Sequence, residues 1–140
     1  MGEVNIFLPP LNDLIIKNKI MNINDYTWHD KVLLNINIDR RNSGIIDEVC
    51  FEIDDNEISK NLVFREVYWL NLNLNFGMVA EESILNIQRL NDDDSDLLSL
   101  YKKWNGHLDE KRLSSYLIEL NTSGGIIKII AEDFTYQNLS

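Results

Sequence analysis

Apolar and polar residues alternate along much of this 140-residue chain, which is the pattern of half-buried β-strands. The alternation is clearest in three short runs, at residues 34–39, 49–53 and 116–120. Residues that favour turns follow each run, at 40–44, 54–57 and 121–125. Because strands joined by a short turn pair antiparallel, these segments predict hairpins.

The longest apolar pattern, over residues 62–76, predicts the strongest strand. Leucine and aromatic residues hold one parity there and asparagines the other, but Glu66 interrupts the apolar side. This interruption predicts a β-bulge, or two strands that join near residues 65–67. The continuous apolar run 126–131 predicts a central strand covered on both faces, and the ambiguous segment 83–90 is interpreted as a further strand.

One helix is predicted after residues 91–94, whose acids suit the positive end of a helix dipole. Its apolar stripe has helical spacing and consists of Leu97, Leu98, Tyr101 and Trp104. Lys102 and Lys103 fall in the predicted last turn, and Gly106 is a suitable C-terminal cap.

The two ends of the chain differ from its middle. Residues 1–26 form a lead-in, with a short strand at 4–8 that Pro9 and Pro10 end and an irregular stretch at 11–20. The polar tail 135–140 is expected to fray. The chain length fits a single domain of residues 1–140 with its core in 27–134.

These elements predict an α+β fold that is mainly β. We expect an antiparallel sheet of about 7–8 strands, as a sandwich or a curled sheet, with one main helix packed on a face. The expected core combines the helix stripe with strand residues, namely Leu34, Ile36, Phe51, Leu70, Leu72, Leu74, Ile127 and Ile129.

The charge balance excludes several classes of partner. With 23 acidic and 13 basic residues the net charge is −10, which argues against binding to nucleic acid or to an anionic membrane.

Cys50 is the single cysteine, so no intrachain disulfide forms. No apolar run approaches the ~18 residues of a membrane span. The start of the chain lacks the positively charged region of a secretory signal peptide. We therefore expect a cytoplasmic protein.

Three motifs suggest chemistry, and each has a simpler structural interpretation. His29 and Asp30 resemble a catalytic or metal-binding pair, but no third group completes a set. The acids of 92–96 lack the glycine and glutamate of a calcium loop, so they are interpreted as a helix start. The segment 123–125 lacks the lysine of a phosphate-binding loop and is interpreted as a turn. We expect no catalytic residue, no metal and no cofactor.

The tryptophans and the remaining acids are the candidates for partner contact. Trp28, Trp69 and Trp104 are expected to anchor the core, but Trp69 shares the parity of the asparagines and is also a candidate anchor for a partner. Grouped carboxylates can steer a basic partner toward a surface. The predicted contact residues are Asp54, Asp55, Glu57, Trp69, Glu81, Glu82, Asp92, Asp93, Asp94 and Asp96.

Several stretches between Trp28 and Phe134 resemble a family of small, acidic bacterial proteins encoded near polymorphic or contact-dependent toxin genes. The matching stretches are Trp28-His29-Asp30, 33–40, Tyr68-Trp69, 73–77, 80–85, Trp104-Asn105-Gly106 and 118–129. The resemblance carries no catalytic residue, and residues 1–26 fall outside it. It implies an intracellular immunity protein that neutralises a cognate toxin domain.

The charge of the chain is compatible with that role. Secreted bacterial toxins are often nucleases, which are basic because they hold phosphates, and an acidic inhibitor can occupy the active site or substrate groove. Two alternatives remain: a non-catalytic adaptor or structural interaction module, and a small enzyme that uses His29 and Asp30. The oligomeric state is left open.

Overall fold

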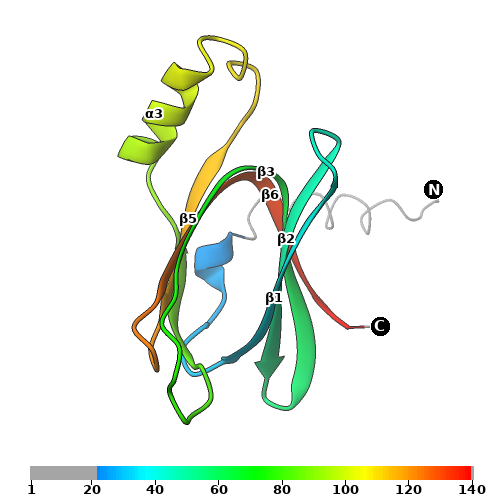
Figure 1. Cartoon of the computed structure of the whole chain (residues 1–140), viewed down its shortest axis with the longest axis vertical. Helices are drawn as coiled ribbons and strands as arrows, with labels where there is room; N and C mark the ends of the chain where they lie inside the picture. Colours follow the sequence, from blue (N-terminus) through cyan, green and yellow to red (C-terminus); the bar gives the residue numbers. More distant parts are fainter. Residues whose placement is uncertain (1–21, 140) are drawn as a thin grey trace, which may run out of the picture.

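A computed structural model describes residues 22–139, which form one curled antiparallel sheet with a single α-helix (Figure 1). The strand order is β1-β2-β3-β6-β5-β4. In chain order the elements are the 3-10 helix η1 (Ile23–Asp25), β1 (Val32–Asn42), β2 (Ile46–Asp55), β3 (Ile58–Asn73), β4 (Ile84–Arg89), α3 (Ser95–Lys103), β5 (Ser114–Leu120) and β6 (Ile126–Asn138).

The mainly β architecture with one helix is confirmed, in its curled-sheet form. The six strands are slightly fewer than the 7–8 expected. One reason is that β3 runs unbroken through Glu66, which holds a positive φ of 50° beside a register shift between Val67 and Trp69. The predicted bulge is therefore correct, but it does not divide the strand. The strand expected at 4–8 and the irregular stretch 11–20 lie outside the described residues.

The two edge strands of the sheet approach each other at one end of the molecule. Val32 of β1 pairs with Asp54 on one side and forms an isolated bridge to Ser83 on the other. Ile84 N–H also donates to the carbonyl of Lys31 at 2.7 Å. The N–H groups of Asp30 and Leu33 donate to the carbonyls of Ile84 and Glu82 at 2.9 and 2.8 Å. The strands β1 and β4 are not neighbours in the sheet beyond this short segment, so the described sheet is not closed. The curl brings the β2–β3 turn and the segment before β4 to the same end.

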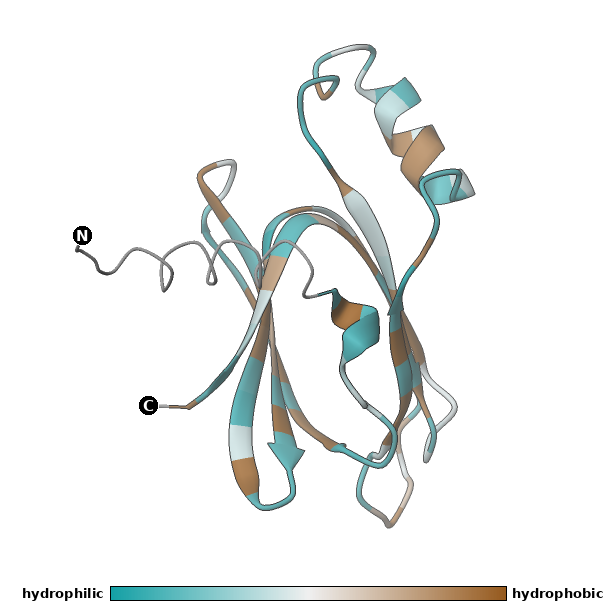
Figure 2. Ribbon diagram, turned by 180° about the vertical axis from the view of Figure 1, so that it is seen from behind, coloured by the Kyte–Doolittle hydropathy of each residue, from teal (hydrophilic) through white to brown (hydrophobic). Residues whose placement is uncertain are grey.

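The main hydrophobic core fills the inside of the curl. Figure 2 shows η1 lying within it, and Ile23 is fully buried there. The Trp28 indole N–H donates to the Ile23 carbonyl at 2.8 Å, and its ring lies 4.7 Å from that of Tyr136. Residues 22–26, which the sequence assigned to a lead-in, therefore contribute to the core.

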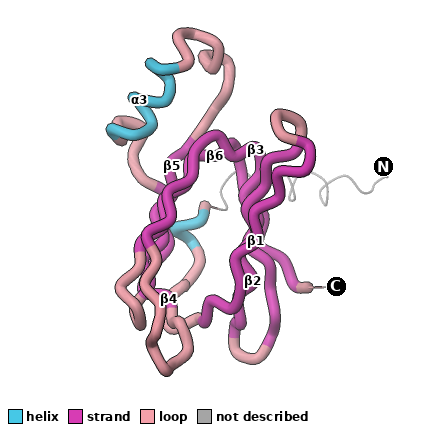
Figure 3. Tube along the Cα trace, in the orientation of Figure 1, coloured by secondary structure: helices cyan, strands magenta, loops and turns pink. Residues whose placement is uncertain are grey.

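The outer face carries a second, smaller core beneath α3. Figure 3 shows the helix standing at the end of the molecule opposite the β2–β3 turn. Leu97 and Leu100 of α3 pack there with Leu108, Leu113 and Ile130. Ile130 faces this cluster while Ile129 faces the main one, and both are fully buried. The prediction that 126–131 is a central strand covered on both faces is confirmed.

Several core predictions are confirmed and four are wrong. Phe51, Ile127, Ile129 and Leu97 are buried, while the partly buried residues that pack against the two cores include Ile36, Leu70, Leu74 and Tyr101. Leu34, Leu72, Leu98 and Trp104 are 50%, 39%, 53% and 44% exposed.

Three of these four errors have a local cause. A register shift between Leu33 and Asn35 turns Leu34 to the outside, because one extra residue exchanges the faces of a strand. Leu72 pairs with the second residue of β6, next to the end of the sheet. Leu98 lies on the flank of a helix that covers the sheet through Leu97 and Leu100.

The C-terminal tail was expected to fray, and residues 135–138 contradict that expectation. They extend β6 and pair with β3, where Tyr136 lies opposite Leu62. Tyr136 also packs against Trp28, and the Lys60 ammonium lies over its ring in a cation–π contact, 5.2 Å from the ring centroid. A polar sequence with one well-placed aromatic residue is therefore an ordered part of the sheet.

Candidate partner-binding surfaces

The motifs that suggested chemistry are found in different settings in the part of the chain that the structure describes. Within residues 22–139 no group of three or more His, Cys, Asp or Glu side chains is arranged to hold a metal ion. His29 Nε2 lies 3.5 Å from Asp30 Oδ1, and both side chains are mostly exposed. No helix in the same range has the length and apolar character needed to cross a bilayer.

The acids at the start of α3 bind within the molecule. Asp94 is the N-cap, and its carboxylate accepts from the Leu97 N–H and the Ser115 hydroxyl. The Lys128 ammonium forms ion pairs with both Asp94 and Asp96, at 2.7 Å from Oδ1 of Asp94 and 2.6 Å from Oδ2 of Asp96. Asp92 pairs with Arg89 at 2.8 Å, while Asp93 is exposed. The predicted helix start is confirmed, and Asp94 is largely committed to the fold.

The other predicted acids gather at the end where the edge strands meet, and we call this surface the acidic end. It comprises the β2–β3 turn, residues 29–31, and the segment before β4. Asp54 and Ser83 flank Val32 on its two sides, so the turn and that segment lie close together. The carboxylates of the acidic end belong to Asp30, Asp54, Asp55, Glu57, Glu81 and Glu82.

The acidic end has little free positive charge. Its lysines, Lys31 and Lys60, lie 3.6 and 2.9 Å from Asp55 and are only 16% and 24% exposed. The hydrogen bond from Lys60, helped by the charge of Lys31, lowers the pKa of Asp55. Asp55 is therefore a structural ion, whereas Glu57 and Glu81 are exposed carboxylates that no described basic side chain neutralises by an ion pair.

An exposed apolar loop, residues 76–79, adjoins the acidic end. Phe76, Met78 and Val79 are 86%, 55% and 103% exposed. The loop is held on both sides by the β5–β6 turn, because Asn75 donates to the Ser123 carbonyl and Thr122 donates to the Glu81 carbonyl. Apolar side chains held in water beside carboxylates are typical of a protein-binding surface.

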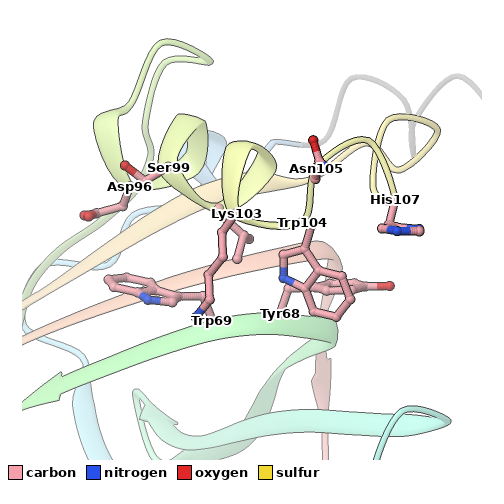
Figure 4. A pocket seen from close by; sticks show the side chains of 9 residues that line it. Tyr68, Trp69, Asp96, Ser99, Lys103, Trp104, Asn105 and His107 are labelled. Carbon is pink, nitrogen blue, oxygen red and sulfur yellow. The ribbon is translucent and has the colours of Figure 1, made fainter.

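A second candidate surface, the aromatic groove, lies on the outer face between the β1–β2 turn and the segment after α3. Its main hollow has a volume of about 820 Å³ and continues into a second of about 480 Å³. Both are lined by Tyr68, Trp69, Trp104 and His107. Figure 4 shows these side chains gathered beneath α3, and the Tyr68 and Trp104 rings meet edge to face at 6.2 Å.

Charged side chains lie around the bulge in the floor of the groove. Lys111 Nζ lies 3.6 Å from Oε1 of both Glu66 and Glu132. Within residues 22–139 that buried oxygen of Glu132 has no hydrogen-bond partner. Burial and the neighbouring Glu66 carboxylate raise the pKa of Glu132. The bulge therefore holds two close carboxylates next to one lysine.

The structure divides the predicted contact residues among three regions, of which the start of α3 holds Asp92, Asp93 and Asp94. Five of them, at the β2–β3 turn and before β4, meet at the acidic end. Trp69 lies in the aromatic groove together with Asp96, far from that end in the fold. Reasoning from the sequence missed the apolar loop, because Phe76 continues the apolar parity of β3, and it missed Trp104, which was assigned to the core.

No family model matches this chain, and no curated protein is significantly similar to it in sequence. The resemblance to toxin-associated proteins remains a prediction.

Proposed function

We propose that this chain is a protein-binding module that captures one basic partner and blocks it, as an immunity protein neutralises a nuclease-type toxin domain. The observation that carries the proposal is the exposed apolar loop beside the acidic end. Phe76 and Val79 can anchor a partner while Glu57 and Glu81 attract its positive charge.

The interior of the sheet supports a role in protein binding over the binding of a small molecule inside the curl. Large side chains fill that space, among them Trp28, Phe51 and Phe64, each at most 2% exposed. Their rings pack edge to face or tilted against neighbouring rings. The described surfaces that offer contacts lie outside, at the acidic end and in the aromatic groove.

The electrostatics suggest how the partner is blocked. A nuclease binds phosphates with a basic surface, so a rigid acidic surface competes for the same positive side chains. The net charge of −10 steers such a partner from a distance, and the effect weakens as salt shortens the range of the field. The apolar loop then supplies contacts that salt does not screen.

Capture of a partner tests this proposal. The tagged full chain is incubated with lysate of the organism that encodes it, in ~50 and ~200 mM salt, which bracket weak and strong screening. We expect one stoichiometric protein with a basic surface, retained at both salt concentrations. Replacing Phe76 and Val79 by Asp should abolish capture. Asp does not repel a basic partner, but burying its carboxylate in an apolar contact costs free energy, so the two anchors are lost.

A matched variant controls for the loss of exposed apolar surface. Ile46 and Leu98 are 40% and 53% exposed and lie away from the acidic end and the apolar loop, so replacing them by Asp should leave capture intact. Several partners that dissociate at the higher salt would instead favour the adaptor. Equal capture by both double variants would reject the apolar loop as the contact.

A further inference from the structure

The aromatic groove differs from the acidic end in combining rings and aliphatic side chains with charged groups of both signs in one concave surface. The basic side chains in its lining are Arg40, Lys103 and Lys111. Its β1–β2 wall presents Ile38 and Ile45, which are 43% and 81% exposed. Its opposite wall presents Trp104, 44% exposed, with His107 beside it. The shape and the exposed apolar area suit an extended segment of another protein.

Among the carboxylates that line this groove, Asp39 and Asp47 pair with Arg41 and Arg40 at 2.7 and 3.3 Å. Two others are only loosely paired with basic side chains. Glu66 lies 3.6 Å from Lys111, and Glu48 lies 3.9 Å from Arg65, both beyond ordinary hydrogen-bond length. The Glu66 and Glu48 side chains are 51% and 39% exposed. Both carboxylates can therefore accept hydrogen bonds from a cationic group that enters the groove.

The backbone at Glu66 adds an independent indication of function. Its φ of 50° lies in the left-handed region, in the middle of the 16-residue strand β3. A residue with a side chain costs about 1–2 kcal/mol there relative to its ordinary conformation. Glu66 lies in the lining of the groove together with Tyr68 and Trp69, and the register shift follows it between Val67 and Trp69. Strain of this kind gathers at binding sites.

We propose that the aromatic groove binds an arginine side chain of the partner, with the guanidinium facing the Glu66 carboxylate and the ring of Trp104. Apolar residues that flank the arginine pack against Ile38 and Ile45. Arginine fits better than lysine, because its planar fork matches a carboxylate and stacks on an indole. The inference rests on the proposed function for the source of the arginine, a basic protein partner.

A peptide titration tests the groove without the partner. The ¹⁵N-labelled full chain is titrated with acetyl-Leu-Arg-Leu-amide, and with the same peptide carrying citrulline, which has the shape of arginine but no charge. We expect the indole N–H signals of Trp104 and Trp69 to shift saturably with the arginine peptide. The Trp28 signal should stay fixed, because this indole is buried and donates to Ile23.

The charge of the peptide and of Glu66 should both matter. The citrulline peptide, and the arginine peptide on Glu66→Gln, should each bind about five-fold more weakly, as expected for a partly exposed charge-assisted hydrogen bond. Glu57→Gln, an exposed carboxylate at the acidic end, should bind like the unmodified chain.

Two results would overturn the inference: no shift of the Trp104 and Trp69 signals, or equal binding of the arginine and citrulline peptides. Trp104→Leu provides a second variant, since it keeps an apolar side chain and should also weaken binding. Failure here is distinguishable from failure of the proposed function, because capture of the partner is tested through the apolar loop.

Discussion

Asp94 links the helix to the sheet through one partly buried carboxylate. It caps α3 by accepting from the Leu97 N–H, and it binds Ser115 of β5 and Lys128 of β6. Burial alone would raise its pKa, but the hydrogen bonds from Lys128, Ser115 and Leu97 outweigh burial and lower it. The ionised form is therefore the one that the folded state favours.

This lowered pKa sets the direction of a pH effect on stability. Asp94→Asn keeps a cap acceptor but loses the ion pair, so it should lower the free energy of unfolding by about 1–3 kcal/mol at pH 7. Because a carboxyl with a lowered folded-state pKa stabilises above its unfolded pKa, the difference from wild type should close as the pH falls below about 4. Urea unfolding at pH 7 and pH 3 measures it.

Asp93→Asn is the matched control for this variant, because Asp93 is exposed and neighbours the cap. It should leave the unfolding free energy nearly unchanged at both pH values. A constant deficit of Asp94→Asn across the pH range would show that the ion pair is not its cause.

Glu66 combines backbone strain with a position in the aromatic groove. Glu66→Gly removes the cost of a side chain at positive φ and relieves the repulsion of Glu132, so it should raise the unfolding free energy by about 1 kcal/mol. Urea denaturation measures the change. Loss of stability in this variant would contradict the assignment of strain to this residue.

At the scale of elements, hydrophobic alternation was enough to predict the hairpins. Strands β1, β2, β5 and β6 follow the predicted runs, and α3 begins at its predicted cap. The bulge that follows Glu66 was also predictable, because a charge on the apolar side of a long strand is a strong local signal. Leu34 was not, because the shift between Leu33 and Asn35 leaves no mark in the pattern.

The ordered tail could not be inferred from its own composition. Residues 135–138 are polar, and their order depends on pairing with β3, about 70 residues earlier in the chain. Tyr136 adds ring contacts to Trp28 and Tyr26, and its hydroxyl donates to Asp55 at 3.3 Å. Burial and the Asp55 charge raise the pKa of this hydroxyl, which therefore keeps its proton and serves as a donor.

Replacement of Tyr136 tests the order of the tail. Tyr136→Ala should lower the unfolding free energy by about 3 kcal/mol, the cost of deleting a large ring from an aromatic core. Gln137→Ala, at an exposed neighbouring position, should change it little. Thermal or urea unfolding provides the measurement, and equal, small effects of both variants would indicate that the tail contributes nothing to stability.

At the scale of the whole molecule, the sequence shows where the acidic segments are, but it does not predict which of them lie together in the fold. The pairing of Val32 with both Asp54 and Ser83 joins two acidic segments that lie about 25 residues apart, and it leaves the acids at the start of α3 elsewhere. Lys128 forms ion pairs with Asp94 and Asp96. These pairs could not be predicted from the sequence, because Lys128 lies more than 30 residues away along the chain. The acidic end is therefore a product of sheet curvature.

In the proposed function, the acidic end steers one basic partner onto the apolar loop. The association rate of the captured partner as a function of salt tests this steering. We compare the unmodified chain with Glu57→Lys/Glu81→Lys and with Asp109→Lys/Glu110→Lys, which makes the same change in net charge at exposed positions at the opposite end of the molecule.

We expect Glu57→Lys/Glu81→Lys to slow association by about ten-fold at low salt and to flatten its salt dependence, because steering depends on local charge at the contact. The control pair should reduce the rate much less. Equal slowing by the two pairs would show that only the total charge matters, and it would contradict the placement of the partner at the acidic end.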